Sequence, residues 1–195
     1  AGGKLHAEFR GDDAAAAERA CALVHEGRVA AVMKGHLHTD DLLKPMLDKA
    51  FERVSQTTGK KVEIKQGDIR DVELPENHYD IILAGAVLHH LRDDHDWETT
   101  FNKIYKLLRR GGCLMISDLI TQDTELLNDY TWERYGDYLE SIGGKEYRSK
   151  VLDYVAKEDS PRSMNYQLDL MKKVGFRSVE ILHKNMCFGA FGGIK

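Results

Sequence analysis

The sequence predicts a single α/β domain over residues 1–195, with a mostly parallel sheet and helices on both faces. Strand patterns and helix patterns alternate five times along the chain, which is the order that parallel sheets require. Two of the strand patterns, 29–33 and 79–84, are short apolar runs of the kind buried on both faces of a sheet. The last two, 178–182 and 186–191, are so close in sequence that they predict an antiparallel hairpin.

The first third of the chain predicts three strands and two helices. Residues 4–9 alternate as a short strand, 29–33 form the second strand, and 62–65 form the third. Helix 14–25 is rich in alanine, and a second helix over about 41–57 follows a Thr-Asp capping pair. The second helix carries an apolar stripe at helical spacing, made of Leu43, Met46, Leu47, Ala50, Phe51 and Val54.

The remaining elements are predicted in the order strand, helix, strand, helix, helix and hairpin. Their ranges are 79–84, 97–108, 113–117, 123–157 and 163–174, followed by the hairpin. Gly175 is a natural stop for the last helix. The acidic run Asp93, Asp94 and Asp96 around His95 is typical of a helix N-terminus, where it complements the dipole, and no metal site is predicted.

Composition narrows the function classes. The 28 basic against 32 acidic residues give a net charge of -4, which argues against nucleic-acid and membrane-surface partners. No apolar run approaches the roughly 20 residues of a membrane helix, and the N-terminus lacks an apolar signal core. Three widely spaced cysteines exclude a disulfide framework and favour buried free thiols. A cytoplasmic protein is expected.

From about residue 46 onward, five motifs occur in a familiar order. They are Gly67-Asp68-Ile69, Leu74-Pro75 through Tyr79-Asp80-Ile81-Ile82, Val87-Leu88-His89-His90-Leu91, Leu107-Leu108-Arg109-Arg110-Gly111-Gly112, and Val174-Gly175-Phe176 before the hairpin. This set resembles class I S-adenosylmethionine-dependent methyltransferases, with Arg110 in place of the usual proline. The resemblance implies a three-layer, Rossmann-like methyltransferase sheet and S-adenosylmethionine as cofactor.

The resemblance also assigns candidate site residues. Asp68 and Ile69 would contact adenine, because a carboxylate at a strand's carboxyl edge faces the ligand crevice of open α/β sheets. The alternative is that Asp68 only caps the turn after Gly67. The turn after the fourth strand would approach the amino-acid end of the cofactor; it consists of Ala84, Gly85 and Ala86.

His89 and His90 are the candidate catalytic residues. An imidazole titrates near neutral pH, so either histidine is suited to act as a general base. The alternative is that these histidines pack or face solvent at a helix start. Methyl transfer does not always need a base, because proximity and alignment supply much of the rate.

Two cofactor signatures of these methyltransferases are absent. The turn after the first strand, 9–14, holds one glycine where a glycine-rich loop is expected. The second strand ends in Met33-Lys34-Gly35-His36, without the acid expected for the ribose hydroxyls. Weak or absent binding of S-adenosylmethionine is therefore expected.

Residues of about 4–47 resemble a different family. The string Met33-Lys34-Gly35-His36-Leu37-His38-Thr39-Asp40 and the helix before it are similar to phosphate acetyl/butyryltransferases. Lys34, Gly35 and Thr39 would then form an anion-binding turn at a helix start, and a simple capped turn is the alternative. The two resemblances together suggest an engineered or recombined chimera that joins 1–45 to 46–195.

Three functions follow from these patterns. The first is a chimeric scaffold with a methyltransferase-like fold and no efficient catalysis. The second is an S-adenosylmethionine-dependent methyltransferase with an atypical cofactor loop. The third is a domain that binds phosphate or a coenzyme A fragment. The expected partner is a small-molecule ligand, with no nucleic acid and no membrane, while the methyl acceptor and the oligomeric state are left open by the sequence.

Overall fold

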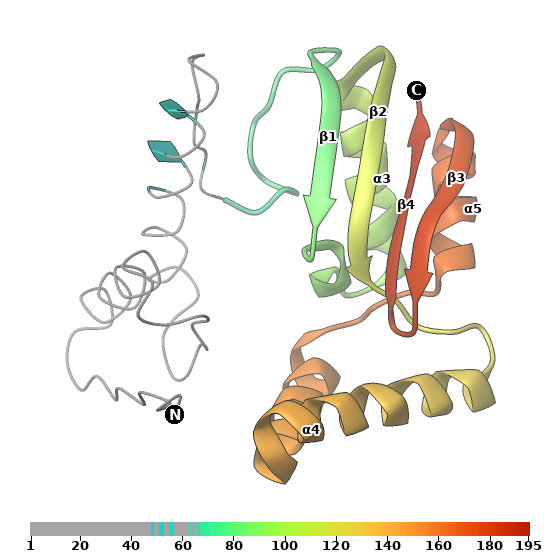
Figure 1. The fold of residues 1–195 in the computed structure, drawn as a ribbon. Coiled ribbons are helices and arrows are strands. Elements are labelled where there is room, and N and C mark those ends of the chain that lie inside the picture. Colours follow the sequence, from blue (N-terminus) through green and yellow to red (C-terminus); the bar gives the residue numbers. More distant parts are fainter. Residues whose placement is uncertain (1–47, 49–50, 53–54, 57–62, 64, 66) are drawn as a thin grey trace. The chain divides into compact units, whose positions relative to one another are not determined.

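The computed structural model describes residues 48, 51, 52, 55, 56, 63, 65 and 67–195 (Figure 1). The chain divides into two compact units, Ala1–Gly67 and Asp68–Lys195. The predicted elements 4–9, 14–25 and 29–33 lie outside the described residues. The five described residues of predicted helix 41–57 are helical, although Phe51 is exposed. Glu63 and Lys65, the described residues of predicted strand 62–65, are not in a strand.

The sheet of the second unit is mixed. Its strands are β1 (Tyr79–Gly85), β2 (Leu108–Leu119), β3 (Arg177–Asn185) and β4 (Phe188–Ile194), in the spatial order β1-β2-β4-β3. β1 and β2 are parallel, whereas β4 is antiparallel to both β2 and β3. The α/β fold and the terminal hairpin are confirmed. In the described part of the sheet β1 is an edge strand, although its apolar run is of the kind buried on both faces of a sheet.

Two of the described helices begin at a residue whose side chain caps them. A 3-10 turn, η1 (Leu88–His90), precedes α3 (Asp94–Leu107). α3 starts earlier than predicted because the Asp93 carboxylate accepts a hydrogen bond from the Asp96 amide at 2.9 Å. α5 (Met164–Val174) ends at Gly175, which adopts a left-handed φ of 113° as expected for a glycine stop.

The long helical region between β2 and α5 is kinked. α4 (Glu125–Glu158) contains Gly144 with φ 82° and ψ 178°, values outside the helical range, so two helical segments meet there. Glycine permits this bend because a side chain would be strained at that φ. Figure 1 shows α4 beyond the end of the sheet toward which β1 and β2 run. This placement brings the C-terminus of α4 to the carboxyl ends of those strands.

The core lies between the sheet and two helices. α3 and α5 lie against the same face of the sheet (Figure 1). Trp97, Phe101, Leu114 and Phe191 are all fully buried there. Cys187 is buried as well, and burial raises the pKa of its thiol to about 11. Among the described residues, no helix has the length and apolar character that crossing a membrane requires.

Candidate functional site

The carboxyl ends of β1 and β2 form the frame of the candidate site. The last pair of the parallel ladder joins Gly85 to Ser117, and the Ala86 amide donates to the Ser117 carbonyl at 2.9 Å. Ala86 then adopts a φ of 53°, which turns the chain away from the strand direction. Because η1 follows at once, His89 and His90 lie at the edge where open α/β sheets bind ligands.

Asp118 anchors the residues at this edge of the sheet through hydrogen bonds. It stands near the end of β2, and its side chain is 1% exposed. The carboxylate accepts hydrogen bonds from the amides of Leu88 at 2.7 Å and Val87 at 3.3 Å, and it also bonds Nδ1 of His89. A buried carboxylate is tolerated when its oxygens are satisfied in this way. Asp118 therefore holds both the start of η1 and the imidazole of His89.

Asp159 is the second buried carboxylate beside the two histidines. It is the C-terminal cap that directly follows α4, and its side chain is 3% exposed. Its carboxylate lies 2.9 Å from Nδ1 of His90 and 3.8 Å from Nε2 of His89. The next amide, Ser160, donates to the His89 carbonyl at 2.7 Å. We call His89, His90, Asp118 and Asp159 the histidine–carboxylate cluster.

The carboxylates of the cluster raise the pKa of His89. Burial disfavours the imidazolium, but the hydrogen bond to Asp118 and the charges of Asp118 and Asp159 outweigh it, so the pKa of His89 is raised above 6.5. Since Asp118 bonds Nδ1, a neutral His89 keeps its proton on Nδ1 and its lone pair on Nε2. That tautomer leaves Nε2 free to accept a proton.

Asp68 forms a local ion pair that the sequence did not predict. Arg70 donates from its backbone amide and its guanidinium to the Asp68 carboxylate, at 2.7 to 3.0 Å. These bonds lower the pKa of Asp68 to about 2. Arg70 also reaches Asp96 in the first turn of α3 at 2.8 Å. The predicted turn is present, because the Val72 amide donates to the Asp68 carbonyl, so Asp68 is an ionised carboxylate in a fixed turn.

The predicted cofactor turn is open at its centre. A Cβ placed on Gly85 would meet no atom of the described residues within 4 Å. Gly85 is exposed, whereas Ala84 on its N-terminal side is buried and Ile69 is half-buried. Open space beside backbone at the end of a strand is what a close-lying ligand needs. The other predicted binding residues, Lys34, Gly35 and Thr39, lie outside the described residues.

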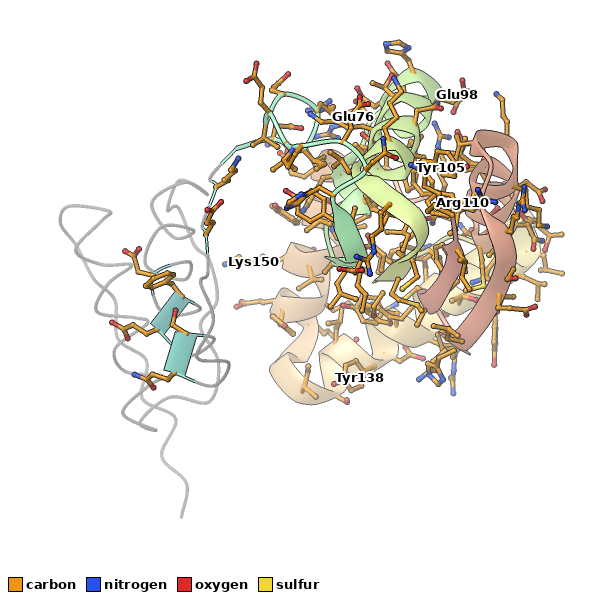
Figure 2. All side chains as sticks on the ribbon, turned by 90° about the horizontal axis from the view of Figure 1, so that it is seen from above. Glu76, Glu98, Tyr105, Arg110, Tyr138 and Lys150 are labelled. Carbon is orange, nitrogen blue, oxygen red and sulfur yellow. The ribbon has the colours of Figure 1, made fainter. Side chains whose placement is uncertain are left out.

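A separate surface cavity of about 530 Å³ lies over α3, and none of the predicted site residues lines it. Glu76, from the segment before β1, and Glu98, from α3, border this cavity and are labelled in Figure 2. Lys103 also lines it, and its ammonium donates to the carbonyls of Arg70 and Val72. None of the four residues of the histidine–carboxylate cluster lines this cavity, so the two sites are distinct.

Sequence reasoning missed the two carboxylates of the cluster. Asp118 had a usable signal, because it ends a predicted strand region in the same way that Asp68 does. No sequence signal pointed to Asp159, because the course of α4 is what places this residue beside the histidines. Asp93, Asp94 and Asp96 form a helix start, as predicted.

Comparison with known proteins agrees with the methyltransferase resemblance. Residues 23–116 match the family described as "Methyltransferase domain". Carboxy-S-adenosyl-L-methionine synthase of Helicobacter hepaticus is 28% identical over 150 residues, which cover 76% of this chain and 61% of that protein. Phosphoethanolamine N-methyltransferase of Plasmodium falciparum is 31% identical over 133 residues, which cover 61% of this chain and 49% of that protein. The chain thus spans about half to three fifths of these relatives.

Solved structures show the same fold. A candidate O-methyltransferase from Nostoc punctiforme superposes with a TM-score of 0.52 at 17% identity, over 80% of this chain and 42% of the other. The hypothesis of an acyltransferase fragment gains no support from the comparisons, and the methyltransferase match already begins at residue 23, inside the supposed fragment. A chimeric origin is likewise unsupported. In sequence, residues 23–116 are thus similar to a methyltransferase domain, and in fold the chain resembles a solved methyltransferase structure.

Proposed function

We propose that the chain transfers the methyl group of S-adenosylmethionine to a small molecule that bears a hydroxyl or an amine. The observation that carries this proposal is the methyltransferase match over 23–116, which includes Asp68, Gly85 and His89. The same stretch contains the candidate adenine contact, the candidate cofactor turn and the candidate base. This proposal replaces the inactive scaffold as the preferred function.

The described residues fit the cofactor at two points. Asp68 is ionised above about pH 2 and exposed, so its carboxylate is able to accept a hydrogen bond from an adenine amino group. Gly85 offers open space beside backbone at the end of β1. S-adenosylmethionine supplies an electrophilic methyl group on a sulfonium. Its affinity is expected to be weak, because Lys34 stands where these methyltransferases place an acid.

His89 is the proposed general base. Asp118 bonds Nδ1 and thereby keeps the lone pair of the neutral ring on Nε2, from which His89 accepts the proton of the acceptor group. After transfer, the imidazolium is stabilised by the charges of Asp118 and Asp159. Such positioned bases contribute about 10²- to 10⁴-fold in rate. Asp118 acts through His89 and is a positioning residue.

Titration with S-adenosylhomocysteine tests the cofactor assignment directly. The full chain is expected to show saturable binding in calorimetry or by amide shifts in NMR. Asp68→Ala is expected to weaken that binding about 10- to 100-fold, because a hydrogen bond to a charged group contributes about 1.5–3 kcal/mol. Asp71→Ala, which removes an exposed carboxylate from the same turn, is the matched control and should bind like the parent chain. Equal binding by Asp68→Ala and the parent, or no saturation below millimolar ligand, contradicts the proposal.

A further inference from the structure

The two histidines and Asp159 converge more closely than a general base requires. One ligand-type atom from each of His89, His90 and Asp159 lies within 4.8 Å of the others. The imidazole rings are 4.1 Å apart between centroids. The carboxylate of Asp159 faces both rings, at 2.9 Å from His90 Nδ1 and 3.8 Å from His89 Nε2.

These separations match the coordination shell of a small divalent ion. Zn²⁺ binds imidazole nitrogen and carboxylate oxygen at about 2.0–2.2 Å, so ligand atoms in a tetrahedral shell are about 3.4 Å apart. The Asp159 carboxylate lies 2.9 Å from His90 Nδ1 through Oδ1 and 3.8 Å from His89 Nε2 through Oδ2, so its two oxygens approach the rings at separations on either side of that value. Two histidines and one carboxylate are also a donor set that suits first-row transition metals.

Asp118 supplies the support that metal-bound histidines usually have. Its buried carboxylate bonds Nδ1 of His89, which leaves Nε2 as the coordinating nitrogen. A carboxylate behind a histidine in this way fixes the ring and raises its basicity as a ligand. His90 is 49% exposed, so an ion has a path from solvent and its fourth coordination position can hold water.

We propose that His89, His90 and Asp159 form a binding site for a divalent first-row metal ion, with Zn²⁺ as the best-suited ion. The site is open, because the protein supplies three ligands of the four that zinc prefers. Bound Zn²⁺ occupies Nε2 of His89, the atom that would otherwise accept a proton. The ion therefore competes with the base role of His89 and suppresses methyl transfer that depends on it.

Calorimetric titration of the metal-stripped full chain with Zn²⁺ tests the site without any methyl donor. One ion per chain is expected. His90→Ala and Asp159→Asn should each lower the affinity for Zn²⁺ at least about tenfold. Even mutation of residues that only hydrogen-bond to metal ligands lowers metal affinity about 10- to 100-fold. His95→Ala is the matched control, because His95 lies on the same stretch of chain but outside the cluster.

The visible spectrum of bound Co²⁺ gives a second readout, with intense bands expected for a tetrahedral site in the parent chain and weakened bands in His90→Ala. His90 is half-exposed, so its variant decides the question even where Asp159→Asn fails to fold. Equal Zn²⁺ affinity in His90→Ala and His95→Ala, or no stoichiometric binding by the parent chain, overturns the proposal. Either result leaves the S-adenosylhomocysteine test unaffected, because that ligand is absent from this experiment.

Discussion

His89 Nδ1 bonds the carboxylate of Asp118, a side chain that is 1% exposed. The pair joins the turn after β1 to the end of β2, which are neighbours in the parallel ladder. This contact affects the pKa of His89 as well as the local structure. A buried carboxylate beside an imidazole favours the charged ring, so the pKa of His89 reports directly on this contact.

Asp118→Asn is expected to lower the pKa of His89. The amide retains a hydrogen-bonding oxygen but removes the charge, so burial is opposed only by the more distant Asp159. Imidazole nitrogen shifts measured by NMR across a pH titration give the midpoint in both proteins. An unchanged His89 midpoint would show that Asp118 does not control its titration.

The stability of the chain is expected to depend on pH through the same group. The folded-state pKa of His89 is raised, so its contribution to the free energy of unfolding is complete below about pH 6.5 and is lost as pH rises through the folded value. Urea unfolding at pH 6 and at pH 8 measures the loss. His89→Gln removes the titrating group and should flatten this dependence; an equally steep dependence in that variant would assign it to other groups.

The sequence was most informative where local chemistry determines structure. Gly175 ends α5 as predicted, because glycine adopts the left-handed φ of 113° without strain. The hairpin of β3 and β4 was predictable from two short strand patterns with a brief turn. The start of α3 was placed late, because the capping bond from Asp93 depends on a side-chain conformation that spacing alone does not give.

The site was predictable only in part, for a similar reason. His89 was selected as a candidate because it follows a strand pattern closely, in a recognisable motif. Asp159 is brought to the histidines by the length and bend of α4. The Gly143-Gly144 pair marks a break in the helical pattern, but it does not give the direction of the bend. Contacts that depend on the path of a long helix are global properties, whereas capping and strand ends are local ones.

Leu114→Ala is expected to cost about 2–5 kcal/mol in the free energy of unfolding. Leu114 lies on β2 with no exposed surface, so truncation removes buried contacts and leaves a cavity. Leu126→Ala is the matched control, because the same substitution is made at a side chain that is 81% exposed on α4. Its expected cost is within about 0.5 kcal/mol. Urea denaturation measures both, and equal costs would place Leu114 outside the core.

Lys34→Asp is expected to tighten the binding of S-adenosylhomocysteine. The prediction rests on the sequence, since Lys34 lies outside the described residues. An acid at the end of the predicted second strand is able to accept hydrogen bonds from ribose hydroxyls, each worth about 1.5–3 kcal/mol for a charged acceptor. Lys4→Asp makes the same charge change elsewhere and should leave the affinity unchanged. Equal effects of both substitutions would indicate a non-specific response to net charge.

Gly85→Ala and Gly192→Ala are expected to separate ligand approach from folding. A Cβ at Gly85 meets no atom of the described part of the chain within 4 Å, so the free energy of unfolding of that variant should lie within about 0.5 kcal/mol of the parent's. A Cβ at Gly192 would clash with the Leu114 carbonyl oxygen, so that variant should be clearly destabilised. If the cofactor lies against the end of β1, the methyl group of Gly85→Ala blocks its approach, and affinity for S-adenosylhomocysteine falls about tenfold or more. Urea denaturation and calorimetry give the two readouts, and a stable Gly85→Ala chain that binds like the parent would place the ligand away from this strand end.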